Sequence, residues 1–137
     1  MRVMVLVKEG DDYEAGRMPS TEELEAMGRF NEELAKAGIM VAGEGLAPSS
    51  EGKRVRFDGD APSVIDGPFT ETKELVAGYW IWEVASLDEA AEWLKRAPFS
   101  DTEVEIRRIF GADDFGDAYT PEQRERDERL HQEISGR

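Results

Sequence analysis

The sequence predicts an α+β domain of the ferredoxin-like βαββαβ type, with a hairpin insertion and an additional C-terminal helix. Three observations lead to this prediction. Short β-branched or aromatic runs alternate with two amphipathic helical segments in the order strand, helix, strand, strand, helix, strand. Both helical segments begin with a capping signal. Two of the strands are apolar on both faces, which predicts a second copy of the chain against the face that the helices leave bare.

Composition and charge narrow the classes of function. The chain has 137 residues, a single-domain length, with 31 acidic residues, 17 basic residues and a formal net charge of −14. Because this charge repels phosphate backbones, we expect no direct binding of nucleic acid. The stretch GKRVRF, with Lys53, Arg54 and Arg56, is a local basic cluster. We interpret it as a solvated strand face rather than as an anion site.

The absence of cysteine excludes disulfide bonds, thiolate metal sites and cysteine nucleophiles, and it fits a reducing compartment. The N-terminal stretch MRVMVLVKEG is too short to span a membrane and lacks a signal-peptide cleavage region, so we expect a cytoplasmic protein without a membrane contact. A metal site would need carboxylates alone. Asp113, Asp114 and Asp117 lack the spacing of a calcium loop, and the sequence predicts neither a metal nor a cofactor.

The first half of the chain predicts a strand, a helix and a second strand. RVMVLVK, residues 2–8, is a β-branched run, and a loop follows over residues 9–19. Ser20 and Glu23 have the spacing of a capping box before a helical stripe that ends at Gly38. Residues 39–48 are typical of a strand, in which Gly43 and Gly45 indicate a bend or a close approach of backbones.

The second half predicts a hairpin, a central strand, a helix and a last strand. Residues 47–65 indicate a short hairpin, KRVRF and SVID around the turn DGDAP, added to the main sheet. ELVAGYWIWEVAS, residues 74–86, is the central strand. Ser86 with Glu89 predicts the start of a helix that must stop near Ala97, before Pro98. EVEIRRIF, residues 103–110, alternates charged and apolar residues, as a half-exposed strand does.

Two strands that are apolar on both faces predict a dimer. We expect a second copy, packed sheet to sheet about a two-fold axis, to cover Trp80, Trp82 and the neighbouring Val and Met residues. We divide the chain into a domain over residues 1–110 and a tail over residues 111–137. The tail predicts a loop and then a polar, exposed helix with Thr120 as its cap and Pro121 at its first position.

The stretch DGPFTETKE, residues 66–74, carries a family resemblance together with AGYWIWEVASLDEAAEWL and RVMVLVK. These segments resemble the YCII-related family, and within it the subgroup named for its Asp-Gly-Pro-Phe motif. The resemblance implies ferredoxin-like domains paired into a dimeric α+β barrel, a setting for cofactor-independent enzymes and small-molecule binders. No settled activity comes with it. In the broader family a His and an Asp are the suggested catalytic pair, but the one histidine here is His131, in the tail.

The motif and its surroundings supply the candidate site. Asp66 is the candidate catalytic residue, a carboxylate general base, although an Asx-turn is the simpler role for it. The candidate ligand-binding residues are Glu44, Phe69, Glu71, Lys73 and Tyr79. Each has a simpler alternative, such as an exposed ion pair for Glu71 or a plug at the core edge for Phe69.

Three functions are compatible with these residues. The leading interpretation is a homodimer that binds a small organic molecule and, if it is an enzyme, transfers a proton through a carboxylate without a cofactor. The second is a regulatory module that contacts a protein such as an extracytoplasmic-function sigma factor, because genes of the resembling subgroup are often found beside those of such factors. The third is a structural motif that braces the dimer.

Overall fold

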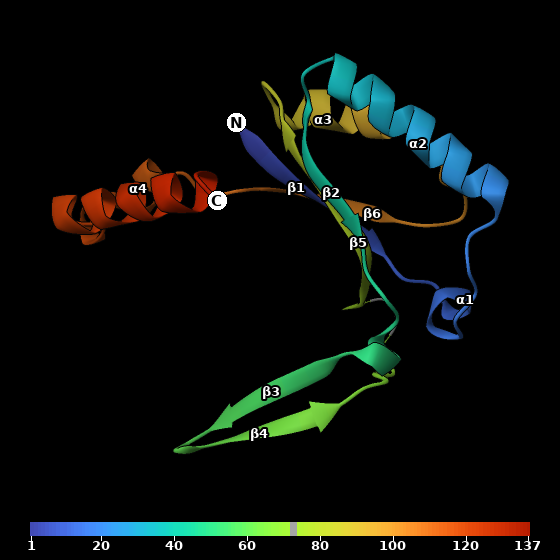
Figure 1. The fold of residues 1–137 in the computed structure, drawn as a ribbon, viewed down its shortest axis with the longest axis horizontal. Helices are drawn as coiled ribbons and strands as arrows, with labels where there is room; N and C mark the ends of the chain where they lie inside the picture. The colour runs from blue at the N-terminus through green and yellow to red at the C-terminus, as the bar shows by residue number, and fades with distance from the viewer. Residues whose placement is uncertain (72–73) are drawn as a thin grey trace.

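The computed structural model describes residues 1–71 and 74–137 and has an α+β architecture (Figure 1). Its main sheet has the strand order β2-β5-β1-β6, and all neighbouring strands are antiparallel. The strands are β1 (Arg2–Lys8), β2 (Met40–Gly45), β5 (Val76–Glu83) and β6 (Val104–Arg108). With helices α2 (Thr21–Lys36) and α3 (Leu87–Leu94), this is the predicted ferredoxin-like βαββαβ order, in which each helix connects strands that are not neighbours in the sheet.

Both helices begin at the predicted caps. Ser20 Oγ accepts a hydrogen bond from the Glu23 N–H at 3.1 Å, and Ser86 Oγ accepts one from the Glu89 N–H at 3.1 Å. These bonds satisfy backbone donors that the first turn of a helix leaves unpaired. The Glu23 carboxylate contacts Arg17. Helices α2 and α3 lie on the same side of the main sheet (Figure 1).

The core lies between the sheet and these two helices. Its buried side chains are Val3, Val5, Phe30, Leu34, Ile39, Trp80, Trp82, Val84 and Ala90. The ring of Phe30 meets that of Trp80 edge to face, with centroids 5.8 Å apart, and Trp80 Nε1 donates to Asn31 Oδ1 at 2.9 Å. Burying a Val, Leu, Ile or Phe side chain of this core stabilises the fold by roughly 1.5 to 3 kcal/mol.

The prediction that Trp80 and Trp82 form a dimer interface was wrong, because both side chains pack into the core of a single chain. Gly43 makes this packing possible. It pairs with Trp80 across the sheet, and a Cβ at Gly43 would lie 2.6 Å from Trp80 Cδ1. Any other residue at Gly43 would displace the indole, so it is the Trp80 side chain, and not the predicted second backbone, that approaches Gly43 closely.

None of the described helices packs over the opposite face of the sheet (Figure 1). The half-buried side chains of Met4, Leu6, Tyr79 and Ile81 alternate with the core residues along β1 and β5 and so point to this face. The strand register pairs Met4 with Ile81 and Leu6 with Tyr79. An apolar face of the sheet is thus uncovered, as the two-faced strands predicted, but its residues are not the tryptophans.

The insertion forms a hairpin of its own. Strands β3 (Lys53–Asp58) and β4 (Ala61–Asp66) pair only with each other, as a separate two-stranded sheet, so the prediction that they extend the main sheet was wrong. The short helix η1 (Ser49–Glu51) separates the hairpin from β2 and redirects the chain. In Figure 1 the hairpin projects from one end of the sheet, toward the side opposite α2 and α3.

Two segments predicted as loops contain short helices. Helix α1 (Asp11–Glu14) follows β1, and the 3₁₀ segment η3 (Ala112–Ala118) follows β6. The chain ends in α4 (Pro121–Ser135), where Thr120 and Gln123 form the reciprocal cap. Helix α4 has no buried residue and stands away from the sheet (Figure 1). None of the described helices combines the length and apolarity needed to cross a membrane.

Candidate functional site

The Asp-Gly-Pro-Phe turn rests on the helix η1. The Gly67 N–H donates to the Gly52 carbonyl at 3.0 Å, and the Phe69 N–H donates to Ser49 Oγ at 2.9 Å. A Cβ at Gly67 would lie only 1.8 Å from the Ser49 carbonyl oxygen, so no side chain fits there. The motif glycine therefore allows the turn to approach the backbone of a residue 18 positions earlier in the sequence.

Ser49 links this turn to helix α1. Ser49 is buried, its N–H donates to Glu14 Oε1 at 2.7 Å, and its hydroxyl donates to Glu14 Oε2. On the same helix, Tyr13 Oη donates to the carbonyl of Ala77 in β5 at 3.2 Å. Helix α1, η1, β5 and the motif turn thus meet at one end of the main sheet.

Glu9 lies beneath this network. It directly follows β1, is 8% exposed, and no described residue donates a hydrogen bond to its buried Oε2. Burial, followed by the hydrogen bond and the charge of Glu14, raises the pKa of Glu9 to about 7. The pKa of Glu14 is lowered by its hydrogen bonds with Glu9 and Ser49. Glu9 is therefore the member of the pair that bears a proton below pH 7, and Glu14 is the ionised member.

This arrangement suits acid–base chemistry. Two neighbouring carboxyl groups whose surroundings move their pKa values apart provide one proton donor and one ionised acceptor. A carboxyl group whose pKa lies near 7 gains and loses its proton readily at physiological pH. Burial and the charges of Glu9 and Glu14 also raise the pKa of the Tyr13 phenol, which keeps its proton.

The predicted residues of the motif are more exposed. The Asp66 side chain is 74% exposed and forms an ion pair with Lys53 across the hairpin. Phe69 is half-buried, and the Arg54 guanidinium lies 3.8 Å from the centroid of its ring. Glu71 is exposed, and its hydrogen bond and charge raise the pKa of nearby Glu74. Lys73 lies outside the described residues.

Glu44 and Tyr79 come together on the main sheet. They are direct cross-strand partners in β2 and β5. Tyr79 is half-buried on the uncovered face, and Glu44 beside it is exposed. The structure therefore divides the predicted residues into two groups, this strand pair and the motif turn.

Glu9, Glu14 and Ser49 are not among the site residues predicted from the sequence. A signal for Glu9 was present, because the alternation of Val3, Val5 and Val7 continues to Glu9 and places it on the buried side. Glu14 and Ser49 gave no comparable signal, since their contact joins residues that lie 35 positions apart.

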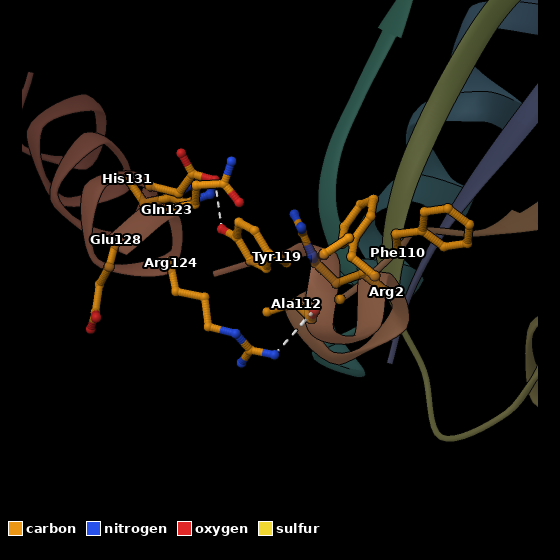
Figure 2. A pocket seen from close by; sticks show the side chains of 12 residues that line it. Arg2, Phe110, Ala112, Tyr119, Gln123, Arg124, Glu128 and His131 are labelled. Carbon is orange, nitrogen blue, oxygen red and sulfur yellow. Dashed lines mark hydrogen bonds between the residues drawn. The ribbon is translucent and has the colours of Figure 1, made fainter. Parts of the chain in front are cut away.

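An open groove lies elsewhere, between the start of β1 and the tail (Figure 2). This open groove has a volume of about 800 Å³ and is lined by residues that include Arg2, Phe110, Phe115, Tyr119, Arg124 and His131. Tyr119 Oη donates to Asp127 at 2.5 Å, which ties η3 to α4. Among the described residues, no group of three or more His, Cys, Asp and Glu side chains is arranged to hold a metal ion.

The chain is similar to known proteins over part of its length. A model of the YCII-related domain matches residues 1–113. An uncharacterized protein of Rhizobium meliloti (strain 1021) is 34% identical over 73 residues, which cover 53% of this chain and 56% of that protein. The match thus spans little more than half of this relative's length.

One solved structure has a weak likeness to the chain. It is a 5-chloro-2-hydroxyhydroquinone dehydrochlorinase from Burkholderia phenoliruptrix, in complex with 2,5-dihydroxybenzoquinone. It is 22% identical, and the alignment covers 81% of this chain and 96% of that one with a TM-score of 0.38. A TM-score this low does not establish a shared activity.

Proposed function

The chain belongs to the YCII-related family, and from this premise we propose that it is a homodimer that binds a small organic molecule and transfers a proton through a carboxyl group. We assign it to the Asp-Gly-Pro-Phe subgroup on the stretch from Asp66 to Phe69. The domain division after residue 110 and the cytoplasmic location belong to the same proposal. A sigma-factor partner stays a prediction of the family resemblance, and no contact in the described residues favours it.

The observation that carries the proposal is the pair of Glu9 and Glu14. The pKa of about 7 makes Glu9 a buried carboxyl group that exchanges its proton near neutral pH, and its Oε2 receives no hydrogen bond from any described residue. Buried polar atoms without partners are rare in folded proteins, because losing hydration without a replacement costs free energy. Glu9 is therefore a better proton donor and acceptor than Asp66, whose carboxylate is exposed and already paired with Lys53.

The uncovered face of the sheet is an alternative place for the ligand, because the alternation along β1 directs Glu9 to the other side of the sheet. Met4, Leu6 and Ile81 offer a hydrophobic surface, and Glu44 with Tyr79 adds polar groups at its edge. Small-molecule sites typically combine such a surface with a few polar groups. A second copy over this face would enclose the site and remove the apolar surface from water.

A thermal-shift screen tests the proposal. A fragment library of small organic compounds is measured against the wild type, Glu9→Gln and Asp66→Asn, with Glu22→Gln, an exposed position on α2, as the matched control. We expect compounds that raise the melting temperature of the wild type and the control but not that of Glu9→Gln. Compounds that stabilise Glu9→Gln equally would place binding elsewhere. Sedimentation velocity at micromolar concentration tests the dimer, and a monomer would contradict it.

A further inference from the structure

The hairpin carries an apolar face that nothing in the described chain covers. The strand register places Val55 opposite Val64 and Phe57 opposite Pro62, so that these four side chains share one face. Val55, Phe57 and Val64 are 51%, 78% and 62% exposed. A two-stranded hairpin is marginally stable alone in water. This apolar face therefore needs a partner.

The tail carries a second exposed apolar surface. Phe110 and Phe115 are 61% and 52% exposed, although their rings meet edge to face at 5.2 Å. Phe115 in turn contacts Tyr119, and these aromatic rings line the groove of about 800 Å³ (Figure 2). The groove is large enough to accept aromatic and branched side chains, and helix α4 forms its other wall.

The positions and charges of the hairpin and the tail indicate that these two surfaces can contact each other. The hairpin and α4 both project to the side of the sheet that α2 and α3 leave uncovered (Figure 1). Residues 111–137 contain eight Asp or Glu residues and four Arg residues, whereas the hairpin, residues 53–66, contains three basic and three acidic residues and is neutral. In a chain of net charge −14, two copies repel each other less where a neutral segment meets an acidic one than where two acidic segments meet.

We propose that the hairpin of one copy inserts its apolar face, centred on Phe57, into the tail groove of a second copy. Two-fold symmetry makes the contact reciprocal, since each copy supplies one hairpin and one groove. The inference rests on the proposed homodimer and specifies how its two copies hold each other. Because β4 runs directly into the motif turn at Gly67, the docked hairpin also fixes the position of that turn.

Cross-linking between two different variants tests this contact. The chain has no cysteine, so Val64→Cys, on the apolar face of the hairpin, and Ala118→Cys, in the groove, each introduce a single thiol. The two purified variants are mixed, allowed to exchange subunits, and oxidised mildly. We expect a covalent dimer whose disulfide joins positions 64 and 118, identified by mass spectrometry of peptides. Each variant alone is expected to give little covalent dimer.

Sedimentation velocity of the same samples distinguishes a wrong contact from a wrong oligomeric state. A stable dimer without the link from 64 to 118, or one that links 64 to 64, overturns the hairpin-to-groove contact and leaves the homodimer standing. A monomer overturns both. As a second measurement, Phe57→Ser and Phe115→Ser should each raise the dimer dissociation constant about tenfold or more, because an aromatic anchor is lost. Met18→Ser, at a position that is 79% exposed outside both surfaces, is the matched control and should leave the constant unchanged.

Discussion

Glu9 follows β1 and Asp66 begins the motif turn, and Ser49 of η1 connects these two regions through hydrogen bonds. The surroundings of the two carboxyl groups are opposite. Glu9 is 8% exposed, touches a second carboxyl group, and has a pKa of about 7. The Asp66 side chain is 74% exposed and sits beside Lys53. The residue that stands out in the sequence is the more exposed one in the structure. Burial and the neighbouring charge make Glu9 a carboxyl group that can exchange a proton at neutral pH.

The largest expected effect comes from breaking the contact between the two regions. Gly67→Ala would place a Cβ 1.8 Å from the Ser49 carbonyl oxygen, which forces the motif turn away from η1. We expect the free energy of unfolding in urea to fall by at least about 3 kcal/mol. Gly45→Ala is the matched control, because no atom lies within 4 Å of the added Cβ. Equal stability of the two variants would show that the turn does not press on Ser49.

The pH dependence of stability distinguishes the two carboxyl groups. The pKa of Glu9 is raised from 4.5 to about 7, so the folded state keeps a proton that the unfolded state loses. The stability from this proton is fully present below pH 4.5 and is lost as the pH rises to about 7. We expect a loss of about 2 to 3 kcal/mol across this window, measured by urea unfolding.

Glu9→Gln should remove this part of the pH dependence. The variant keeps an amide that can donate to Glu14, and its free energy of unfolding should change less than that of the wild type between pH 4.5 and 7. The lowered pKa of Glu14 acts at more acidic pH, because its contribution is lost only as the pH falls below 4.5. Parallel pH profiles for the wild type and Glu9→Gln would show that Glu9 is not the group that titrates.

Ser49→Ala should have the next largest effect, because Ser49 connects the two regions. The change removes the hydroxyl that donates to Glu14 and accepts from the Phe69 N–H. Leaving those partners without a bond should lower the free energy of unfolding by about 2 kcal/mol. The adjacent, exposed Ser50→Ala serves as the control and should stay close to the wild type. A loss of the same size at Ser50 would indicate a general effect on η1.

The fold was predictable where a local signal determined it. Ser20 and Ser86 fixed the starts of both helices, and the β-branched runs fixed the four strands of the main sheet. The sequence could not say which face of β5 the helices cover, because Trp80 and Tyr79 make both faces apolar. Alternation defines two faces, and only the packed structure assigns them to the core or to the surface.

The candidate site was less predictable because contacts between distant segments create it. The motif from Asp66 to Phe69 could be singled out, but its role depends on Ser49 and Glu14, which reach it through hydrogen bonds over long sequence separations. The burial of Glu9 likewise depends on how α1 folds back over the end of the sheet. The contacts of Ser49 and Glu14 follow from tertiary packing and leave no periodic pattern in the sequence, whereas the alternation along β1 did point to Glu9.

The smallest expected effect is that of Asp66→Asn. An exposed ion pair such as that of Asp66 with Lys53 contributes little, because both charges are well hydrated when they separate. We expect the free energy of unfolding to change by no more than about 0.5 kcal/mol and the loss of stability between pH 4.5 and 7 to remain. Lys53→Gln, alone and combined with Asp66→Asn, completes a double-mutant cycle that measures the pair itself. If Asp66→Asn instead removes the pH dependence, the exchangeable proton resides in the motif, and the comparison with Glu9 is reversed.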